Sequence, residues 1–195
     1  MLRRWITVCT LLVGAAPALS AQNQPASVAA PAPAPKKWDV TEPLGPTSKL
    51  QLETNEGTWM NVDVSPDGRT IVFDLLGDIY TMPIAGGRAT RITSGLAFDI
   101  QPRFSPDGSR IAIISDRDGG FNIWTIKPDG SGARQVSKEQ QRLVNSPTWS
   151  PDGQYVYARK HFVRERSLGA GEVWMYHASG TEGLQVTERN GWQKD

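Results

Sequence analysis

Short runs in which apolar and polar residues alternate recur along the chain from about residue 59. They flank a tetrapeptide, Ser-Pro-Asp-Gly, that occurs at residues 65–68, 105–108 and 150–153. Alternation with a period of two predicts β-strands. Pro presets the backbone, Asp accepts backbone hydrogen bonds and Gly adopts the left-handed conformation, so the tetrapeptide favours a tight turn. Each copy is predicted to join two strands in a β-hairpin: WMNVDV, IQPRF and SPTW before the turns, and RTIVF, RIAII and QYVYA after them.

The repeated pattern continues beyond each hairpin. A third predicted strand carries a β-branched residue followed by an aromatic one, as in DIYTM, NIWTI and EVWMY. A Gly-rich turn follows, and then a short fourth strand that ends in RIT, QVS or QVT. The step from the third strand to the fourth is 13 residues in all three repeats: Ile79 to Ile92, Ile123 to Val136 and Val173 to Val186.

Four short antiparallel strands in 40 to 45 residues are typical of a propeller blade. We therefore predict an all-β fold, a partial β-propeller with three four-stranded, WD-repeat-like blades over residues 59–195. Known propellers close a ring of about 4–8 blades. Three repeats fill only an arc, which indicates the front part of a longer protein or a truncated reading frame.

Residues 38–58 precede the first blade and contain KLQLET at residues 49–54. Leu50 and Leu52 alternate with polar residues, so we predict a strand that closes the ring by completing the last blade. A simple extra edge strand is the alternative.

An open arc also leaves one apolar face uncovered at each end, which favours association. The exposed residues are predicted to be Ile71 and Phe73, or Val72, in the first blade, and Val156 or Tyr157 in the third.

The N-terminus has the pattern of a secretory signal peptide over residues 1–21. Arg3 and Arg4 precede an apolar run at residues 5–19, which is shorter than the ~20 residues of a membrane span. Small residues follow, so cleavage is predicted after Ser20 or Ala21. A short membrane anchor is the alternative. The signal predicts a periplasmic protein with no membrane span after cleavage.

Composition adds little evidence for chemistry. Residues 22–37 are rich in Ala and Pro and predict a disordered, extended linker. Cys9 is the only cysteine and lies inside the predicted signal peptide, so the exported chain needs no disulfide partner. The formal net charge is +1, and no basic footprint for nucleic acid is present.

Candidate ligands and catalytic groups are few. Asp67, Asp107 and Asp152 are single carboxylates in separate turns, so we interpret them as turn residues rather than calcium ligands. His161 and His177 stand 16 residues apart and are interpreted as structural or surface residues. There is no GxSxG string. We therefore predict no catalytic, cofactor-binding or metal-binding residue on this chain.

The connection between the second and third strands lengthens along the chain. From the turn serine to the third strand it spans 14, then 18, then 23 residues. The last connection reads RKHFVRERSLGAGE and carries Arg159, Lys160, His161, Arg164 and Arg166 beside Glu165. A basic loop of this kind is suited to docking another domain or steering an anionic substrate. A solvated loop without a function is the alternative.

The repeats followed by DIY or NIW resemble TolB-type propellers. The longer strings EGTWMNVDVSPDG, FDLLGDIYTMPIAGG, QPRFSPDG and RSLGAGEVWMYH are similar to exported amidohydrolase-related proteins that begin with a TolB-like propeller. The resemblance covers residues 38–195. It implies further blades and a metal-dependent hydrolase barrel as partners, with any divalent metal bound in that barrel rather than on this chain.

The resemblance therefore implies a non-catalytic propeller scaffold of such a hydrolase. Two alternatives remain open: a TolB-like module that binds other envelope proteins, and the propeller of an exported serine peptidase. The sequence downstream of Asp195 would distinguish them.

Overall fold

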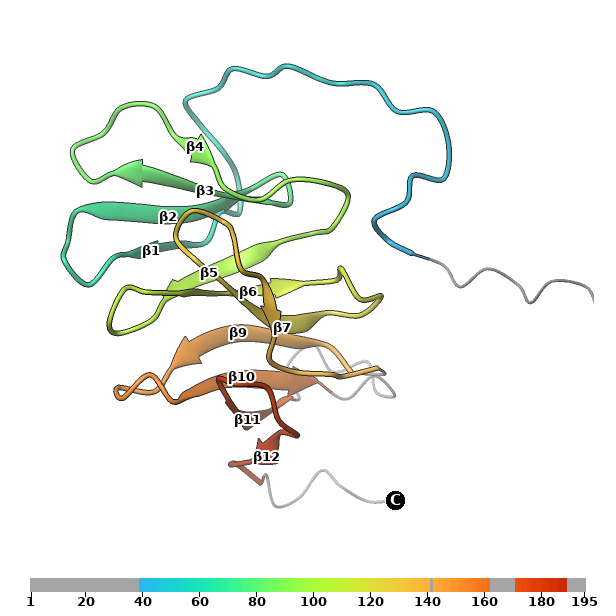
Figure 1. Ribbon diagram of the computed structural model, residues 1–195, viewed down its shortest axis with the longest axis vertical. Helices are drawn as coiled ribbons and strands as arrows, with labels where there is room; N and C mark the ends of the chain where they lie inside the picture. The colour runs from blue at the N-terminus through green and yellow to red at the C-terminus, as the bar shows by residue number, and fades with distance from the viewer. Residues whose placement is uncertain (1–38, 141, 162–170, 189–195) are drawn as a thin grey trace, which may run out of the picture. The chain divides into compact units, whose positions relative to one another are not determined.

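The computed structural model describes residues 39–140, 142–161 and 171–188 (Figure 1). The predicted signal peptide and linker lie outside this range. Every described residue belongs to the unit Lys37–Asp195. The described residues form strands and turns without any helix, which confirms the predicted all-β class.

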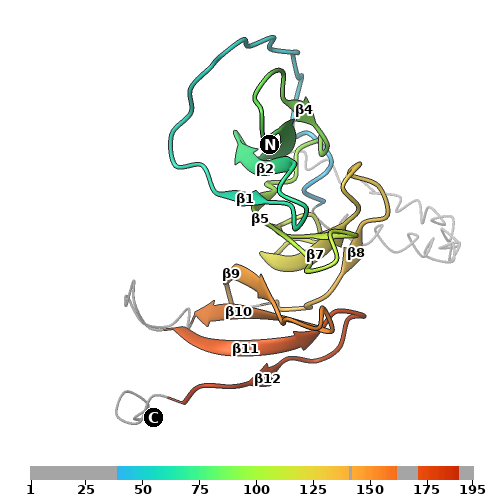
Figure 2. The ribbon, with the colours of Figure 1, turned by 90° about the vertical axis from the view of Figure 1, so that its left-hand side faces the viewer.

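Twelve strands form three antiparallel four-stranded sheets, as predicted (Figure 1). Blade 1 contains β1 (Val62–Val64), β2 (Thr70–Leu75), β3 (Asp78–Pro83) and β4 (Thr90–Arg91). Blade 2 contains β5 (Ile100–Phe104), β6 (Ile111–Ser115), β7 (Asn122–Ile126) and β8 (Arg134–Gln135). Blade 3 contains β9 (Val144–Trp149), β10 (Tyr155–His161), β11 (Gly171–His177) and β12 (Leu184–Gln185). Within each blade the strands lie in chain order, and the blades follow one another along the vertical axis of Figure 2.

Each Ser-Pro-Asp-Gly turn closes the hairpin between the first two strands of its blade. In the first copy the Ser65 carbonyl accepts the Gly68 N–H at 2.8 Å, and the Ser65 hydroxyl accepts the Thr70 N–H at 2.9 Å. The other two copies repeat both bonds. The three turn glycines have φ of +70°, +70° and +69°, a conformation that side chains with a Cβ disfavour.

The constant 13-residue step is a hydrogen-bonded pair between the third and fourth strands. The N–H of Ile92 donates to the Ile79 carbonyl at 2.8 Å, and the other two blades repeat this pair. The hydroxyl residue that follows then accepts the N–H of that same third-strand residue, as Thr93 does from Ile79 at 2.9 Å. Ser137 and Thr187 do the same in blades 2 and 3. This bond explains why the fourth strand ends in RIT, QVS or QVT.

Two hydrophobic cores lie between consecutive blades. The core between blades 1 and 2 is built from Val72 and Ile79 of blade 1 and Phe104, Ile111, Ile113 and Ile126 of blade 2. The core between blades 2 and 3 is built from Ala112, Ile114, Ile123 and Val136 of blade 2 and Val144, Val156, Ala158 and Tyr176 of blade 3. Strand β6 therefore alternates between the two cores and is buried at every position. Complete burial of each isoleucine stabilises the stack by about 1.5–3 kcal/mol.

The first strands β1, β5 and β9 contact one another along one edge of the stack. In β5 and β9 the ladder is interrupted by bulges, where Gln101 and Ser146 have φ of +58° and +53°. The bulged backbone turns its N–H toward the preceding blade. Gln101 donates to the Asp74 carboxylate at 2.7 Å, and Ser146 donates to the Gln101 side-chain oxygen at 2.6 Å. Bulges thus join each blade to the one before it.

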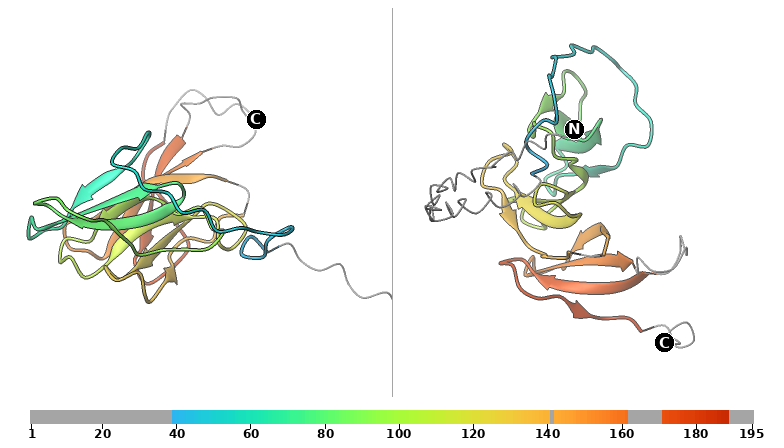
Figure 3. Two further views of the ribbon diagram at one scale, coloured as in Figure 1. Left: turned by 90° about the horizontal axis from the view of Figure 1, so that it is seen from above. Right: turned by 90° about the vertical axis from the view of Figure 1, so that its right-hand side faces the viewer.

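Glycines allow consecutive blades to approach closely. A Cβ on Gly130 would overlap the Ile92 carbonyl oxygen of blade 1, and one on Gly180 would lie 2.9 Å from the Gln135 carbonyl oxygen of blade 2. At the turns, a Cβ on Gly108 would lie 3.4 Å from the Pro66 ring, and one on Gly153 would lie 3.8 Å from the Pro106 ring. Because each turn packs on the turn before it, the tetrapeptide recurs with the blade. Figure 3 shows the blades overlying one another.

The predicted closing strand is unpaired in this structure. Residues 49–54 form no strand, and the side chains of Leu50 and Leu52 are 86% and 57% exposed. They belong to the extended segment that swings away from blade 1 in Figure 2. A closing strand needs a neighbouring strand to pair with, and no described residue supplies one. Ring closure by this segment remains a prediction.

We predict that Gly130→Ala lowers the free energy of unfolding by about 2–4 kcal/mol, because the new methyl group would overlap the Ile92 carbonyl and the backbone would be strained at φ +83°. Gly119→Ala is the matched control, since its φ is +94° and a Cβ placed there would have no atom within 4 Å. The control should lose only about 1 kcal/mol. Urea unfolding of both variants measures the difference, and equal losses would contradict the close approach.

Candidate functional site

A pocket of about 430 Å³ lies between blades 2 and 3. One wall is the segment after β8, and the other walls are β10, β11 and the turn between β11 and β12. We call it the blade 2–3 pocket. Its lining residues are Lys138, Glu139, Lys160, Trp174, Tyr176 and Gly180–Gly183.

An ion pair and an aromatic ring form the floor of the blade 2–3 pocket. The Lys160 ammonium lies 2.7 Å from the Glu139 carboxylate and 3.8 Å from the centre of the Trp174 ring. The Tyr176 hydroxyl donates to the same Glu139 oxygen at 3.0 Å. Burial, and then the neighbouring Glu139 charge, raises the pKa of the Tyr176 hydroxyl. The tyrosine therefore stays protonated and acts as a donor.

Asn122 of blade 2 holds the segment that carries Glu139. Its side-chain oxygen accepts the Glu139 N–H at 2.7 Å and the Ser137 hydroxyl at 2.8 Å, while its amide group donates to the Glu139 carbonyl at 3.1 Å. A Cβ on Gly183 would overlap the Tyr176 ring. The acid and the tyrosine are thus both positioned by close packing.

A similar cluster occurs one blade earlier. Arg117 pairs with Asp99 at 2.7 Å, and its guanidinium lies 5.1 Å from the centre of the Trp124 ring. Trp124 and Trp174 occupy equivalent positions in β7 and β11. Each cluster joins the segment entering a blade to that blade's third strand. The recurrence indicates a structural clamp made of an acid, a cation and an indole.

The clamp explains where part of the predicted basic connection lies. Lys160 occupies the blade 2–3 pocket, and only 9% of its side chain is exposed. It is therefore neutralised by Glu139 and is unsuited to steering an anion. Arg159 lies on the opposite side of β10. Arg164, Glu165 and Arg166 lie outside the described residues, so docking by the rest of this loop remains a prediction.

The two histidines lie at opposite ends of the β10–β11 ladder. His161 pairs with Gly171, and His177 pairs with Tyr155. The six residue steps between these pairs correspond to about 20 Å, too far for one metal. The Nε2 atom of His161 lies 3.0 Å from the Asn145 amide nitrogen, and burial lowers the pKa of His161. His177 contacts Ser179 and the Tyr155 ring. Both contacts are structural in character.

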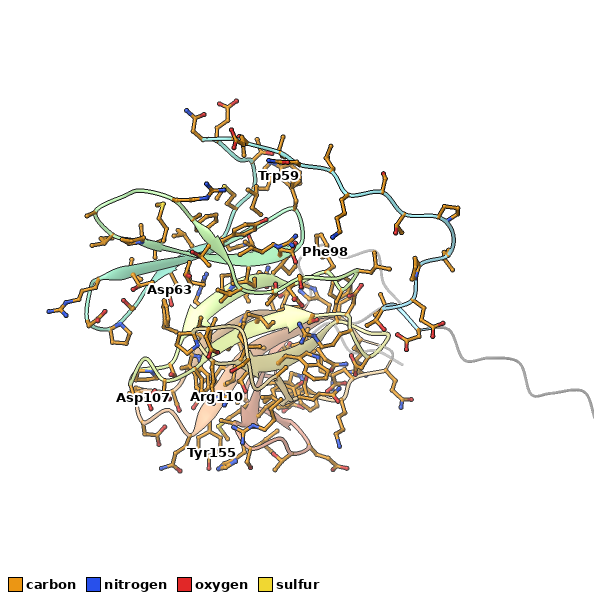
Figure 4. The ribbon with its side chains drawn as sticks, turned by 45° about the horizontal axis from the view of Figure 1, so that its top comes forward. Trp59, Asp63, Phe98, Asp107, Arg110 and Tyr155 are labelled. Atoms are coloured by element: carbon orange, nitrogen blue, oxygen red, sulfur yellow. The ribbon has the colours of Figure 1, made fainter. Side chains whose placement is uncertain are left out.

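The turn aspartates are occupied by their own turns. Asp107 accepts the Ser105 hydroxyl at 2.6 Å, the Ser109 hydroxyl at 2.8 Å and the Ser109 N–H at 3.1 Å. Asp67 and Asp152 accept the equivalent serine hydroxyl and backbone N–H. Figure 4 labels Asp107, in the turn between β5 and β6, and Tyr155, which begins β10 just after the equivalent turn of blade 3. Among the residues the structure describes, no group of three or more His, Cys, Asp or Glu side chains is placed to bind a metal.

Four residues that hold the blades in place were not predicted from the sequence: Asp74, Asp99, Glu139 and Trp174. Asp74 is 4% exposed and accepts hydrogen bonds from the Asn61 N–H at 2.7 Å, the Asn61 amide at 2.8 Å and the Gln101 N–H at 2.7 Å. Only the tryptophans recur at a constant place in the repeat. The acids sit at different offsets, so the repeat gave no signal for them.

Comparison with known proteins identifies the class. Residues 46–187 match the family described as TolB beta propeller domain, and the chain belongs to this family. The solved structure of a putative TolB from Agrobacterium tumefaciens superposes with a TM-score of 0.59 at 25% identity, over 67% of this chain and 50% of that one.

Two sequence relatives each match a little under half of this chain. An uncharacterised protein of Agrobacterium fabrum is 34% identical over 97 residues, which are 48% of this chain and 32% of the relative. Tricorn protease homolog 1 of Streptomyces coelicolor is 30% identical over 88 residues, 45% of this chain and 8% of the relative. The chain thus spans a third or less of the length of these two relatives. In the described part of the chain, no helix has the length and apolar character of a membrane span.

We expect Lys160→Met to lower the free energy of unfolding by about 2–3 kcal/mol, because it leaves the largely buried Glu139 carboxylate without its cation. Lys138→Met is the matched control, since Lys138 lines the same pocket but is exposed. The control should change stability by less than about 0.5 kcal/mol. Adding Glu139→Gln to Lys160→Met should recover part of the loss. Chemical denaturation measures all three, and equal effects of the two lysine variants would contradict the clamp.

A second prediction concerns how the free energy of unfolding changes at low pH. The Ser105 hydroxyl, then the Ser109 hydroxyl and N–H, lower the pKa of Asp107 from 3.8 to about 2. Because the folded pKa lies below the unfolded one, the carboxylate contributes stability above about pH 4, and this contribution is lost as the pH falls toward 2.

Asp107→Asn should therefore flatten the loss of unfolding free energy between pH 5 and 2, by less than about 1 kcal/mol because the group is exposed. Glu182→Gln, in the turn between β11 and β12, provides a charge-matched control. Identical pH profiles for Asp107→Asn and the parent chain would show that the turn bonds do not stabilise the fold.

Proposed function

We propose that this chain is a non-catalytic propeller portion of an exported protein and that it binds or positions another protein or domain. The observation that carries the proposal is the use of its charged clusters. Asp99–Arg117 and Glu139–Lys160 each fasten the segment that enters a blade to that blade, and the turn aspartates bond within their own turns. These groups stabilise a rigid stack and leave its outer turns and loops as the recognition surface.

A TolB-like interaction module is the form we favour. It is supported by the family match over residues 46–187 and by the TM-score of 0.59 to the putative TolB. The propeller of an exported peptidase is the second candidate, supported by the similarity to the Tricorn protease homolog. The amidohydrolase parent rests only on the sequence strings, and the relatives named above add no support for it, so we rank it behind both.

Export is proposed from the N-terminal pattern, with Arg3 and Arg4 before the apolar run. The proposed location is the periplasm, where a chain whose only cysteine is Cys9 is compatible with an oxidising space. Remaining blades and other envelope proteins are the proposed partners.

Fusion of alkaline phosphatase to the C-terminal end tests export in a Gram-negative host. The reporter should be active with the whole chain and inactive when residues 1–21 are deleted, because the enzyme matures only after export. Equal activity of the two fusions would contradict the proposed signal.

A hydrolysis assay tests the non-catalytic role on the purified chain. Alanyl and prolyl nitroanilides should be cleaved no faster than in buffer. Turnover that disappears with a serine-directed inhibitor would overturn the proposal, whatever the result of the fusion experiment.

A further inference from the structure

A second pocket, of about 380 Å³, lies between the Ser-Pro-Asp-Gly turns of blades 2 and 3. We call it the turn pocket. Arg110 and Arg134 line it from blade 2, and Trp149 and Pro151 line it from blade 3. Arg110 is labelled in Figure 4. Both walls of the pocket are therefore formed by described residues of two consecutive blades.

The Arg110 side chain is held in place by neutral groups. Its Nε donates to the Thr125 hydroxyl at 3.0 Å, and its Nη2 donates to the Thr125 carbonyl at 3.1 Å and the Gly132 carbonyl at 2.7 Å. A guanidinium carries five N–H donors, and the two on Nη1 have no acceptor among the described residues. The equivalent turn positions hold Thr70 and Tyr155, so the turn itself does not require an arginine here.

Arg134 brings a second positive charge to the turn pocket. It lies opposite Thr125 in the β7–β8 ladder and is exposed. No described carboxylate forms an ion pair with Arg110 or Arg134. Burial, and then the charge of Arg134, lowers the pKa of the Arg110 guanidinium. An anion bound beside both side chains would offset this repulsion.

Two acids also line the turn pocket, but their own turns occupy them. The Asp107 carboxylate accepts three hydrogen bonds from Ser105 and Ser109. Asp152 accepts the equivalent serine hydroxyl and backbone N–H of its turn. Their negative charges remain, so the pocket disfavours a dense polyanion such as a nucleic-acid backbone. A single carboxylate with uncharged neighbours is the anion that suits this distribution of charge.

The blade 3 wall adds an apolar surface beside the arginines. The Trp149 ring is half-buried and is fixed by its N–H, which donates to the Arg103 carbonyl at 3.0 Å. Pro151 is exposed next to it. An aromatic ring and a proline ring pack well against the apolar atoms of an extended peptide. The turn pocket thus combines unpaired cations with a rigid apolar surface.

We propose that the turn pocket binds the carboxylate of an acidic side chain in an extended segment of a partner protein. The carboxylate accepts charge-assisted hydrogen bonds from Arg134 and from the Nη1 group of Arg110. The uncharged neighbours of the acidic residue lie against Trp149 and Pro151. The inference rests on the proposed binding role and adds the chemistry of the partner.

Titration of the purified chain with a capped pentapeptide, acetyl-Ala-Pro-Glu-Pro-Ala-amide, tests the proposal. The glutamate is the only charged group of this peptide, and the same peptide with glutamine is its matched control. The NMR signal of the Trp149 indole N–H, assigned with Trp149→Phe, reports occupancy. The glutamate peptide should bind with a Kd of about 1 mM or below, and more weakly as the salt concentration rises. The glutamine peptide should bind at least about tenfold more weakly.

A pair of arginine variants locates the binding site. Arg134→Gln should weaken binding of the glutamate peptide about tenfold, because one charge-assisted contact is lost. Arg88→Gln is the matched control, since Arg88 is also exposed but lies between β3 and β4 of blade 1. The control should stay within about twofold of the parent chain. Both substitutions are on the surface, and the remaining indole signals show that each variant is folded.

Four outcomes would overturn the proposal. They are equal binding of the two peptides, no shift of the Trp149 signal at about 10 mM peptide, equal effects of the two arginine variants, and tighter binding of inorganic phosphate than of the glutamate peptide. The experiment measures neither export nor hydrolysis. Its failure would therefore leave the general binding role to be judged by those separate assays.

Discussion

The close approach of consecutive blades is the constraint on which the rest of this structure depends. A side chain at Gly130 or Gly180 would occupy the space of a carbonyl group from the preceding blade. Only at this separation do the isoleucines of β6 pack against both neighbours. A single four-stranded sheet leaves both faces in water, so the hydrophobic stabilisation belongs to the pairs of blades rather than to each blade. Each repeat is therefore stabilised mainly by packing against its neighbours and not by contacts within itself.

Hydrogen bonds between polar groups fix how each blade is aligned on the next. Asp74 accepts hydrogen bonds from its own blade and from the bulge at Gln101 of the next. The indole N–H of Trp149 donates to the Arg103 carbonyl at 3.0 Å, and the Arg103 guanidinium donates to the Val62 carbonyl at 3.2 Å. Such bonds contribute modestly to stability but strongly penalise a shifted arrangement, since each shift would leave a buried polar group unsatisfied. Asp63, labelled in Figure 4, acts in the same way through the Phe104 N–H.

The functional proposal depends on the charged side chains that are already bonded within the fold. Among the described residues, the turn aspartates bond within their turns, and Asp99–Arg117 and Glu139–Lys160 form the clamps. A propeller of this kind serves binding proteins and peptidases alike, because the fold supplies a rigid frame and the loops supply recognition. Trp59, 99% exposed at the N-terminal side of blade 1, belongs to that outer surface (Figure 4).

The sequence by itself determined the local structure. The alternation, the turn tetrapeptide and the 13-residue step predicted the twelve strands and their grouping, because hairpins depend on neighbouring residues and on a few special backbone positions. The sequence also indicated that the turn aspartates belong to their turns, and the structure places them there.

Only the tertiary structure decided which face of each blade is covered and which polar residues join the blades. Val72 and Ile71 are indistinguishable as alternating apolar residues, and their burial depends on the side from which the next blade arrives. The acids Asp99 and Glu139 lie in connecting segments of different length and have no common offset in the repeat. The sequence predicts Lys160 in a basic loop, but Lys160 lies in β10, where strand pairing directs it into the blade 2–3 pocket and Glu139 neutralises it. These pairings join residues brought together by folding, and no local pattern encodes them.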